Sequence, residues 1–215
     1  MAHLNVVLAS IDAPLAEAWQ RLCGDLPGVT IHRGSILDAQ CDAVVSPANS
    51  FGFMDGGIDL LYARHFGWQL EQRLQEVIRA EHHGELLVGH AAIMPTDNAR
   101  IPFLIAAPTM RVPMILRDTV NPYLAARAAL LLIKHGQFRN GPFAGAPVSS
   151  VVRTVAFPGL GTGVGKVVAK TCAKQVRAAI EDVVLDRNSF PKSWADAQAR
   201  HQLLYGEGFR DLQRE

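Results

Sequence analysis

The stretch AVVSPANSFGFMDGGID, residues 43–59, decides the fold class of this chain. Its apolar start, Ala43–Val45, predicts a short buried strand, and the apolar spacing over Ile58–Phe66 predicts a helix after it. Between them lie Gly56 and Gly57, which allow the backbone to turn tightly and to approach a ligand closely. The stretch therefore predicts a strand, a glycine turn and a helix N-terminus, an arrangement whose free N–H groups bind anions.

Two polar residues, Asn49 and Asp59, flank this turn. An amide and a carboxylate can both hydrogen-bond the polar groups of a ligand, such as ribose hydroxyls. Each residue also has an ordinary structural use. Asn often shapes a turn with its own side chain, and an acidic residue in the first turn of a helix is stabilised by the helix dipole. The sequence alone leaves both uses open at both positions.

A second glycine turn follows much later, where residues 157–166 read FPGLGTGVGK. Successive N–H groups in such a turn can surround a phosphate, and Thr162 adds a hydroxyl. The spacing matches neither GxxxxGK[ST] nor GxGxxG, so the turn is neither a Walker A loop nor a dinucleotide fingerprint. A flexible strand-to-helix turn without a ligand is the alternative.

Strands and helices are expected to alternate along most of the chain. Strands are expected over Leu4–Ala9, Val29–His32, Ala43–Val45, Leu86–Met94, Phe103–Ala107 and Val151–Phe157, and helices over Ala13–Cys23, Ile58–Phe66, Trp68–Glu81, Pro122–His135, Val167–Leu185 and Ser193–Tyr205. Asn121 and Ser193 are expected to cap the helices that follow them. This order predicts an α/β domain, a three-layer α/β/α sandwich with a central mixed sheet.

In an α/β sheet, ligands bind beyond the carboxyl ends of the strands. Both glycine turns follow strands and precede helices, so the two turns can lie on one rim and share one ligand. A diphosphate between two sugars would suit such a pair of turns, with Asn49 and Asp59 placed to bind ribose hydroxyls. Arg111 is expected in a surface salt bridge, with a place facing the ligand as the alternative.

The composition limits the class of protein. The chain has 215 residues, of which 49% are hydrophobic, enough for one domain with a sizeable core. Its 21 Lys and Arg against 20 Asp and Glu give a net charge of +1 and predict no basic surface for nucleic acid. A phosphate ligand stays compatible with this balance, because backbone amides bind phosphate without extra cations.

Cysteine usage and the N-terminus indicate a compartment. Cys23, Cys41 and Cys172 are odd in number and far apart, so neither a disulfide framework nor a metal site is expected. The N-terminus is expected to form a strand rather than a signal peptide, and no run of about 18 apolar residues predicts a membrane span. Reduced thiols, a cytoplasmic location and no metal or cofactor are the expectations.

The two glycine turns resemble those of a known family, the macro domains, which bind ADP-ribose. The family pattern V-N-A-A-N, followed by a glycine run, a hydrophobic residue and Asp, is similar to Val45-Ser-Pro-Ala-Asn49 and Gly56-Gly-Ile-Asp59. The second turn, Gly161-Thr-Gly-Val164, resembles the family's S-T-G-V/I. Gly34-Ser-Ile36 stands where the family has G-D-I. The resemblance covers roughly residues 29–183 of a single domain over 1–215, to which a C-terminal helix over 193–205 is appended.

The resemblance implies a site for ADP-ribose across the rim of the sheet. The residues that it implies in binding are Ser35, Ile36, Ser46, Asn49, Gly56, Gly57, Ile58, Gly161, Thr162, Gly163, Val164 and Gly165. It implies that Asn49 and Asp59 also serve catalysis, because Asp59 follows Asn49 at the interval found in the branch that hydrolyses mono-ADP-ribose. A carboxylate there can orient or activate a water at the anomeric carbon.

Four positions depart from the family pattern. Ser35 replaces the acidic residue that usually contacts the adenine amino group, and Ser46 replaces the first Asn of the motif. Met54-Asp55 interrupts the glycine run and adds a negative charge near the expected diphosphate. Gly165 stands where an aromatic residue often covers the distal ribose, a role that Phe51 or Phe53 can take over.

Three functions are consistent with these residues. The first is hydrolysis of an ADP-ribosyl bond, for example mono-ADP-ribose on a protein. The second is a reader of ADP-ribose or a related NAD metabolite without catalysis. The third is a phosphatase that acts on an ADP-ribose phosphate, although no Cys-x5-Arg loop is present. The partner in each case is ADP-ribose or an ADP-ribosylated molecule.

Overall fold

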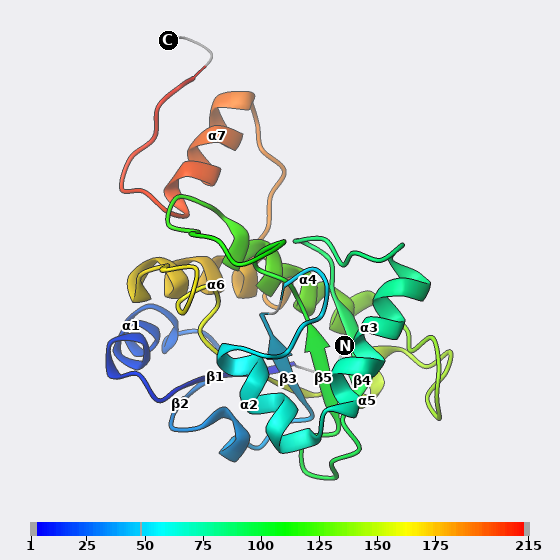
Figure 1. The fold of residues 1–215 in the computed structure, drawn as a ribbon. Helices are drawn as coiled ribbons and strands as arrows, with labels where there is room; N and C mark the ends of the chain where they lie inside the picture. Colours follow the sequence, from blue (N-terminus) through cyan, green and yellow to red (C-terminus); the bar gives the residue numbers. More distant parts are fainter. Residues whose placement is uncertain (1–3, 48, 213–215) are drawn as a thin grey trace.

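A six-stranded sheet forms the centre of the computed structural model, which describes residues 4–47 and 49–212 (Figure 1). The strands are β1 (Asn5–Ser10), β2 (Val29–Arg33), β3 (Ala43–Ser46), β4 (Ala92–Pro95), β5 (Phe103–Ala106) and β6 (Thr154–Phe157). Their order is β2-β1-β6-β3-β5-β4. All neighbours are parallel except β4 and β5, which are antiparallel, so the expected mixed sheet is confirmed.

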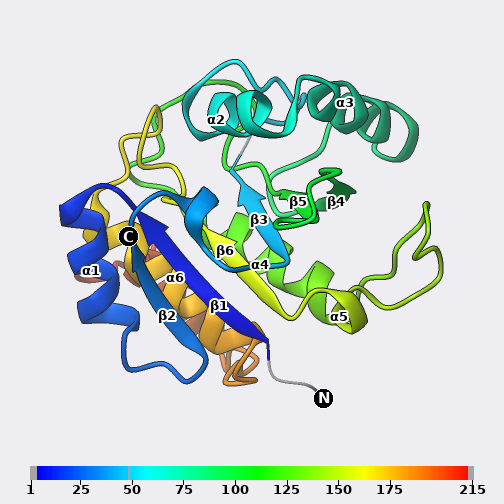
Figure 2. The same cartoon turned by 90° about the horizontal axis from the view of Figure 1, so that it is seen from below.

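Helices cover both faces of this sheet. They are α1 (Ala13–Cys23), α2 (Gly57–Phe66), α3 (Gln69–Glu81), α4 (Asn121–His135), α5 (Val148–Val151), α6 (Ala169–Val183) and α7 (Trp194–Leu203), with a short 3-10 helix η1 (Ile36–Asp38). Figure 2 shows α2 and α3 on one side of the sheet and α4 and α6 on the other. The three-layer α/β/α sandwich expected from the sequence is therefore confirmed.

The strand residues alternate between two hydrophobic clusters. Ala43 and Val45 of β3 pack with α1, α4 and α6. Val44, between them, packs on the opposite face with Tyr62 of α2 and Leu70 of α3. Because side chains alternate between the faces of a strand, a short apolar run is buried on both sides only in the middle layer of such a sandwich. All four residues of β3 are fully buried.

Two strands are shorter than the sequence predicts. The expected strand over Leu86–Met94 begins only at Ala92, because Gly89 adopts a positive φ of 94° and the preceding residues form a turn. The expected strand over Val151–Phe157 begins only at Thr154, because residues 148–151 form a helical turn that the Val152 N–H closes on the Val148 carbonyl. Both segments are apolar, and periodicity does not separate a short buried strand from a buried turn.

The expected N-cap of α4 is also wrong. Val120 occupies the cap position, and no side chain caps the helix. The Asn121 side chain instead donates a hydrogen bond at 2.8 Å to the carbonyl of Thr109, in the segment after β5. The cap of α7 is confirmed, since Ser193 Oγ accepts from the Asp196 N–H at 3.1 Å.

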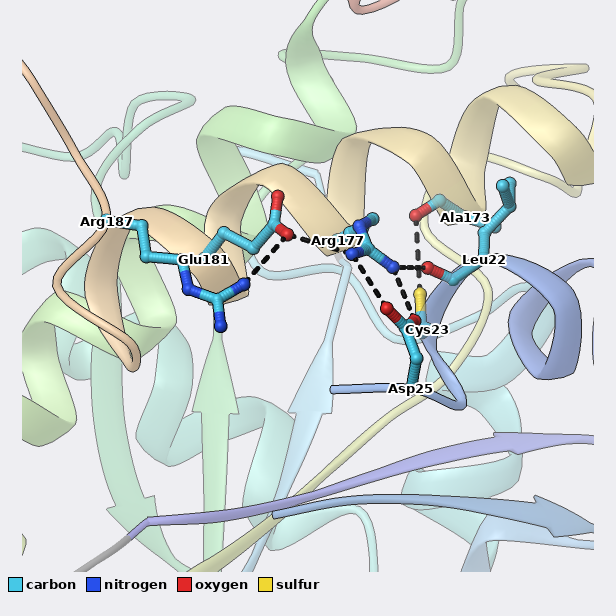
Figure 3. Close-up of polar contacts among 7 residues, drawn as sticks. All are labelled: Leu22, Cys23, Asp25, Ala173, Arg177, Glu181 and Arg187. Carbon is cyan, nitrogen blue, oxygen red and sulfur yellow. Dashed lines mark hydrogen bonds and ion pairs between the residues drawn. The ribbon is translucent and has the colours of Figure 1, made fainter. Parts of the chain in front are cut away.

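An arginine on α6 joins two helices that are far apart in the sequence (Figure 3). Arg177 donates to the Leu22 carbonyl at the end of α1 and to both carboxylate oxygens of Asp25, at 2.6 and 3.0 Å. It also pairs with Glu181, at 3.0 Å, one turn along α6. The bidentate contact fixes the C-terminal end of α1 against α6, beside the buried Cys23.

The C-terminal helix α7 lies at the edge of the molecule (Figure 1). None of its residues is buried. The chain after it contacts α6 through an ion pair between Lys170 and Glu207 at 2.8 Å and a hydrogen bond from Lys174 to the Gly206 carbonyl. Within residues 4–47 and 49–212, no helix has the length and apolar character that a membrane crossing requires.

Candidate functional site

The two glycine turns leave the sheet from neighbouring parallel strands. β3 pairs with β6 through Ala43 with Val155 and Val44 with Ala156. Parallel strands end at the same edge, so the turns after β3 and β6 lie on one rim of the sheet (Figure 2). The two segments that the sequence marks as ligand-binding are therefore neighbours.

The first turn is held in shape by the side chain of Asn49. Its Nδ2 donates to the Phe53 carbonyl at 2.9 Å, and its Oδ1 accepts from the N–H groups of Phe51 and Phe53 at 3.0 and 3.3 Å. Both acceptor positions of the amide oxygen and one of the two amide hydrogens are thus used inside the loop. The turn-shaping use of Asn49 is present, and one hydrogen of its amide has no acceptor among the described residues.

The next residues fasten this turn onto α3. The Met54 side chain is fully buried, and its N–H donates at 2.6 Å to a carboxylate oxygen of Glu71. Gly52 has a φ of 74°, and a Cβ there would lie 2.9 Å from the side chains of Leu74 and Ile78. Met54 therefore interrupts the family's glycine run as a core residue that anchors the turn. Glu71 belongs to no sequence motif, so the sequence alone gives no indication of this contact.

The glycines at the start of α2 lie in open space. Gly56 is the N-cap in an extended conformation, and no side chain caps the helix. A Cβ at Gly56 or at Gly57, whose φ is 56°, would meet no atom within 4 Å. A helix N-terminus without a capping side chain presents its first N–H groups, here including that of Ile58, to an anion such as phosphate.

Asp59 lies in the first turn of α2 and points back toward β3. Ser46 Oγ donates to Asp59 Oδ1 at 2.5 Å, and Ser46 is fully buried whereas Asp59 is 8% exposed. Burial raises the pKa of Asp59 to about 7, and the hydrogen bond from Ser46 acts in the opposite direction. The sequence placed both residues in the site but did not predict that they bond to each other.

The second turn is tightly packed at both ends and open in the middle. A Cβ at Gly165 would lie 2.5 Å from the Gly161 carbonyl oxygen and 2.9 Å from Leu116, whose N–H donates to the Gly165 carbonyl. By contrast, a Cβ at Gly163 would meet nothing within 4 Å, and Val164 is 57% exposed. Gly165 is therefore glycine because the Gly161 carbonyl and Leu116 leave no room for a Cβ, and no sequence motif indicates these contacts.

Ser35 and Ile36 follow β2, at the opposite end of this rim. Ser35 Oγ accepts from the Leu37 N–H at 3.3 Å and so caps the 3-10 helix η1. Ile36 is buried in the cluster beneath α2 and α3. β1 and β6 separate β2 from β3, and Ile36 nevertheless packs in the same cluster as Tyr62 of α2, the helix that carries Asp59.

Arg111 forms the surface salt bridge expected of it. Its guanidinium contacts both carboxylate oxygens of Glu85, at 2.7 and 3.3 Å, and lies over the Phe51 ring at 5.3 Å from the ring centre. The contact covers Phe51, whereas Phe53 is 54% exposed beside the first turn. Phe53 is therefore the aromatic residue of this loop that is open to a ligand.

A cavity of about 720 Å³ lies elsewhere on the molecule. Its lining includes Leu4, Ile133, Val152 and Val184, which surround the amino-terminal ends of β1 and β6. None of the residues of the two glycine turns lines it. The candidate site lies at the edge of the sheet where the parallel strands end. It is defined by the two turns and their hydrogen bonds, not by this cavity.

Comparison with known proteins adds relatives in sequence and in structure. An uncharacterized protein of Aquifex aeolicus is 30% identical over 155 residues, 72% of this chain and 80% of that protein. An uncharacterized protein of Aeropyrum pernix is 29% identical over 151 residues, covering 70% of this chain and 69% of that protein.

Solved macrodomains have the same fold. The Oceanobacillus iheyensis macrodomain with ADP has a TM-score of 0.57 at 19% identity, covering 71% of this chain and 74% of that chain. The macrodomain of Mycobacterium tuberculosis DarG has a TM-score of 0.55 at 18% identity, covering 70% of this chain and 88% of that chain.

The family model described as Macro domain matches residues 45–176. The matched region begins in β3 and includes both glycine turns, α2 and the first half of α6. The shared rim, the two turns and this match lead to one conclusion: the chain belongs to the macro domain family.

Proposed function

We propose that this macro domain binds ADP-ribose across its rim and hydrolyses an ADP-ribosyl bond. The Ser46–Asp59 pair beside the uncapped start of α2 is the observation that carries this proposal, because it places a carboxyl group next to an anion-binding turn. The N–H groups of residues 56–58 and 161–165 would hold the diphosphate. Solved macrodomains of Oceanobacillus iheyensis with ADP and with ADPR support the ligand class.

The reaction that fits this arrangement is an attack by water on the anomeric carbon of the distal ribose. The water oxygen forms a bond to that carbon, and the bond to the leaving group breaks with its electron pair. Asp59 accepts the proton that the water gives up, and the leaving group receives one proton in the overall reaction. A carboxyl group whose pKa is about 7 can hold and release a proton near neutral pH.

Calorimetry with ADP-ribose and an assay for released ADP-ribose test the two parts of the proposal. We expect a Kd in the micromolar range, which corresponds to roughly −8 kcal/mol. We also expect turnover of mono-ADP-ribosylated protein, and Asp59→Asn should reduce it by at least about a hundredfold while binding persists. Absence of heat and of a thermal shift would refute the binding, and absence of turnover on ester, N-linked and nucleic-acid ADP-ribose would refute the hydrolysis.

A reader of ADP-ribose or a related NAD metabolite is the second candidate function. The observation in its favour is the side chain of Asn49, whose amide oxygen is bonded to two N–H groups of its own loop and so has little capacity for catalysis. A reader would bind ADP-ribose with similar affinity but release no product. The turnover assay distinguishes the two candidates.

We infer a cytoplasmic location for this chain from its thiols. Cys23, Cys41 and Cys172 are free and buried, and burial raises the pKa of each to about 12. Buried, protonated thiols are unreactive and suit a reducing compartment. Fractionation of cells that express the native chain tests this location.

A further inference from the structure

The hydrogen bond between Ser46 and Asp59 joins two elements of the site. Ser46 is the last residue of β3, and Asp59 lies in the first turn of α2, 13 positions later. Both side chains are buried, and the bond measures 2.5 Å. A buried carboxyl group is unfavourable without hydrogen bonds, so this single donor determines how the group is oriented.

The other carboxylate oxygen, Oδ2, remains open. Within the described part of the chain, it has no hydrogen-bond partner. In that part, the fully buried side-chain atoms that lack a hydrogen-bond partner are Trp19 Nε1 and Ser50 Oγ. Because Oδ2 of Asp59 also lacks a partner but is not among these buried atoms, it retains contact with solvent. The exposed 8% of Asp59 agrees with this. One oxygen of the carboxyl group is thus held by β3, and the other is accessible.

We propose that Ser46 is a positioning residue that fixes the Asp59 carboxyl group through Oδ1, so that Oδ2 is the oxygen presented to the attacking water. This inference rests on the hydrolysis proposed above. The position of Ser46 explains why the two oxygens of Asp59 have different roles. A fully buried hydroxyl at the end of β3 can reach only the carboxylate oxygen that points into the sheet, which is Oδ1. The water then gives its proton to Oδ2, and the Ser46 proton stays on its own oxygen.

A purely structural role for Ser46 would be to attach α2 to β3. The helix has a second attachment of this kind, in which the Tyr62 hydroxyl donates to the Val45 carbonyl at 3.1 Å. Val45 precedes Ser46, and Tyr62 lies one turn after Asp59. The two hydroxyls therefore join the same two elements, but only Ser46 contacts the carboxyl group, which makes Tyr62→Phe a matched control.

The titratable neighbours do not complicate this comparison. Burial raises the pKa of Tyr62 well above its usual range, and the charges of Asp59 and Cys41 add to the effect. Burial raises the pKa of Cys41 to about 12. Neither neighbour changes its charge near pH 7, so neither contributes to a titration of the Asp59 carboxyl group observed there.

The experiment compares Ser46→Ala, Ser46→Thr and Tyr62→Phe with the wild-type chain. It measures the pKa of the Asp59 carboxyl group by NMR, the kcat and KM of ADP-ribose release, and the melting temperature. Ser46→Ala should raise that pKa and reduce kcat roughly tenfold, the effect of one lost hydrogen bond to a charged group, with KM within twofold. Ser46→Thr should restore both values. Tyr62→Phe should lower the melting temperature and leave the pKa and kcat unchanged.

Two results would overturn the proposal: a carboxyl pKa in Ser46→Ala equal to that of the wild type, or equal changes in Ser46→Ala and Tyr62→Phe. If Ser46→Ala does not fold, Ser46→Cys retains the size of the side chain with a weaker donor and gives the same comparison. A wild-type chain that binds ADP-ribose without turnover refutes the proposed reaction. In that case the NMR titration still decides whether Ser46 holds Asp59.

Discussion

At the scale of single residues, the carboxyl group of Asp59 has the strongest influence on how the site behaves with pH. Burial favours its neutral form, and the hydroxyl of Ser46 favours its charged form. Burial is the larger effect and raises the pKa to about 7 from the usual 3.8. The group therefore changes its charge in the range where a macro domain would have to act as a base.

This raised pKa predicts how stability depends on pH. The folded chain keeps a proton on Asp59 that the unfolded chain releases, so this stabilisation is complete below pH 3.8 and is lost as the pH rises through about 7. Asp59→Asn removes the dependence. At pH 8 we expect the variant to be more stable than the wild type by on the order of 4 kcal/mol, and at pH 3 the two should be equal. Urea unfolding between pH 3 and pH 9 measures this, and parallel curves would contradict it.

The second glycine turn allows a matched pair of substitutions. Gly165→Ala places a Cβ 2.5 Å from the Gly161 carbonyl oxygen, whereas Gly163→Ala meets no atom within 4 Å. We expect Gly165→Ala to lower the free energy of unfolding by about 1–3 kcal/mol, the usual effect of overpacking, and Gly163→Ala to leave it nearly unchanged. Thermal unfolding of the two variants tests the difference. Equal losses would show that the close contacts with the Gly161 carbonyl and Leu116 do not explain why position 165 is glycine.

At the scale of elements, sequence reasoning predicted the local features of the site and missed its contacts. The two turns could be predicted because glycine spacing and strand-to-helix order are local. The Ser46–Asp59 bond could not, because it depends on the direction in which α2 leaves the turn. The contact of Leu116 with Gly165 and the hydrogen bond from the Met54 N–H to the Glu71 carboxylate join separate segments of the sequence, and no motif indicates them.

The same distinction explains the corrected element boundaries. Ser193 caps α7 as predicted, in a helix that buries none of its residues. Asn121 has the same cap-forming chemistry, but the Thr109 carbonyl lies within 2.8 Å of its side chain. Tertiary contacts therefore override local preference where an element is packed, and local preference holds where an element is exposed.

The cap of α7 gives a prediction for this element alone. Ser193→Ala should increase hydrogen exchange of the α7 backbone about fivefold, because a lost N-cap costs about 1 kcal/mol of helix stability. The helix buries none of its residues, so the melting temperature of the domain should stay constant. Exchange monitored by mass spectrometry measures the first effect and calorimetry the second. A lower melting temperature would show that α7 contributes to the core after all.

At the scale of the whole molecule, Arg177 connects the first helix to the last helix of the sandwich. Arg177→Ala removes the contacts with Leu22, Asp25 and Glu181. We expect a decrease in melting temperature of roughly 2–4 °C, because the pairs are partly exposed and screened by solvent. In 1 M salt the part of this decrease that is due to ion pairs should be smaller, because salt screens them. Arg177→Lys cannot form the bidentate contact, so its melting temperature should lie between those of the wild type and Arg177→Ala. An unchanged melting temperature in Arg177→Ala would contradict the prediction.

The position of β6 in the sheet has a consequence for when the candidate site can form during synthesis. β6 lies between β1 and β3, although about 110 residues separate it from β3 in the sequence: the Thr154 N–H bonds to Asp42, 112 positions earlier. Pairings between such distant segments form slowly, because a long loop must close first. The first half of the candidate site is therefore translated well before its partner, and the growing chain lacks the complete pair of glycine turns until the ribosome has completed β6 and the turn that follows it.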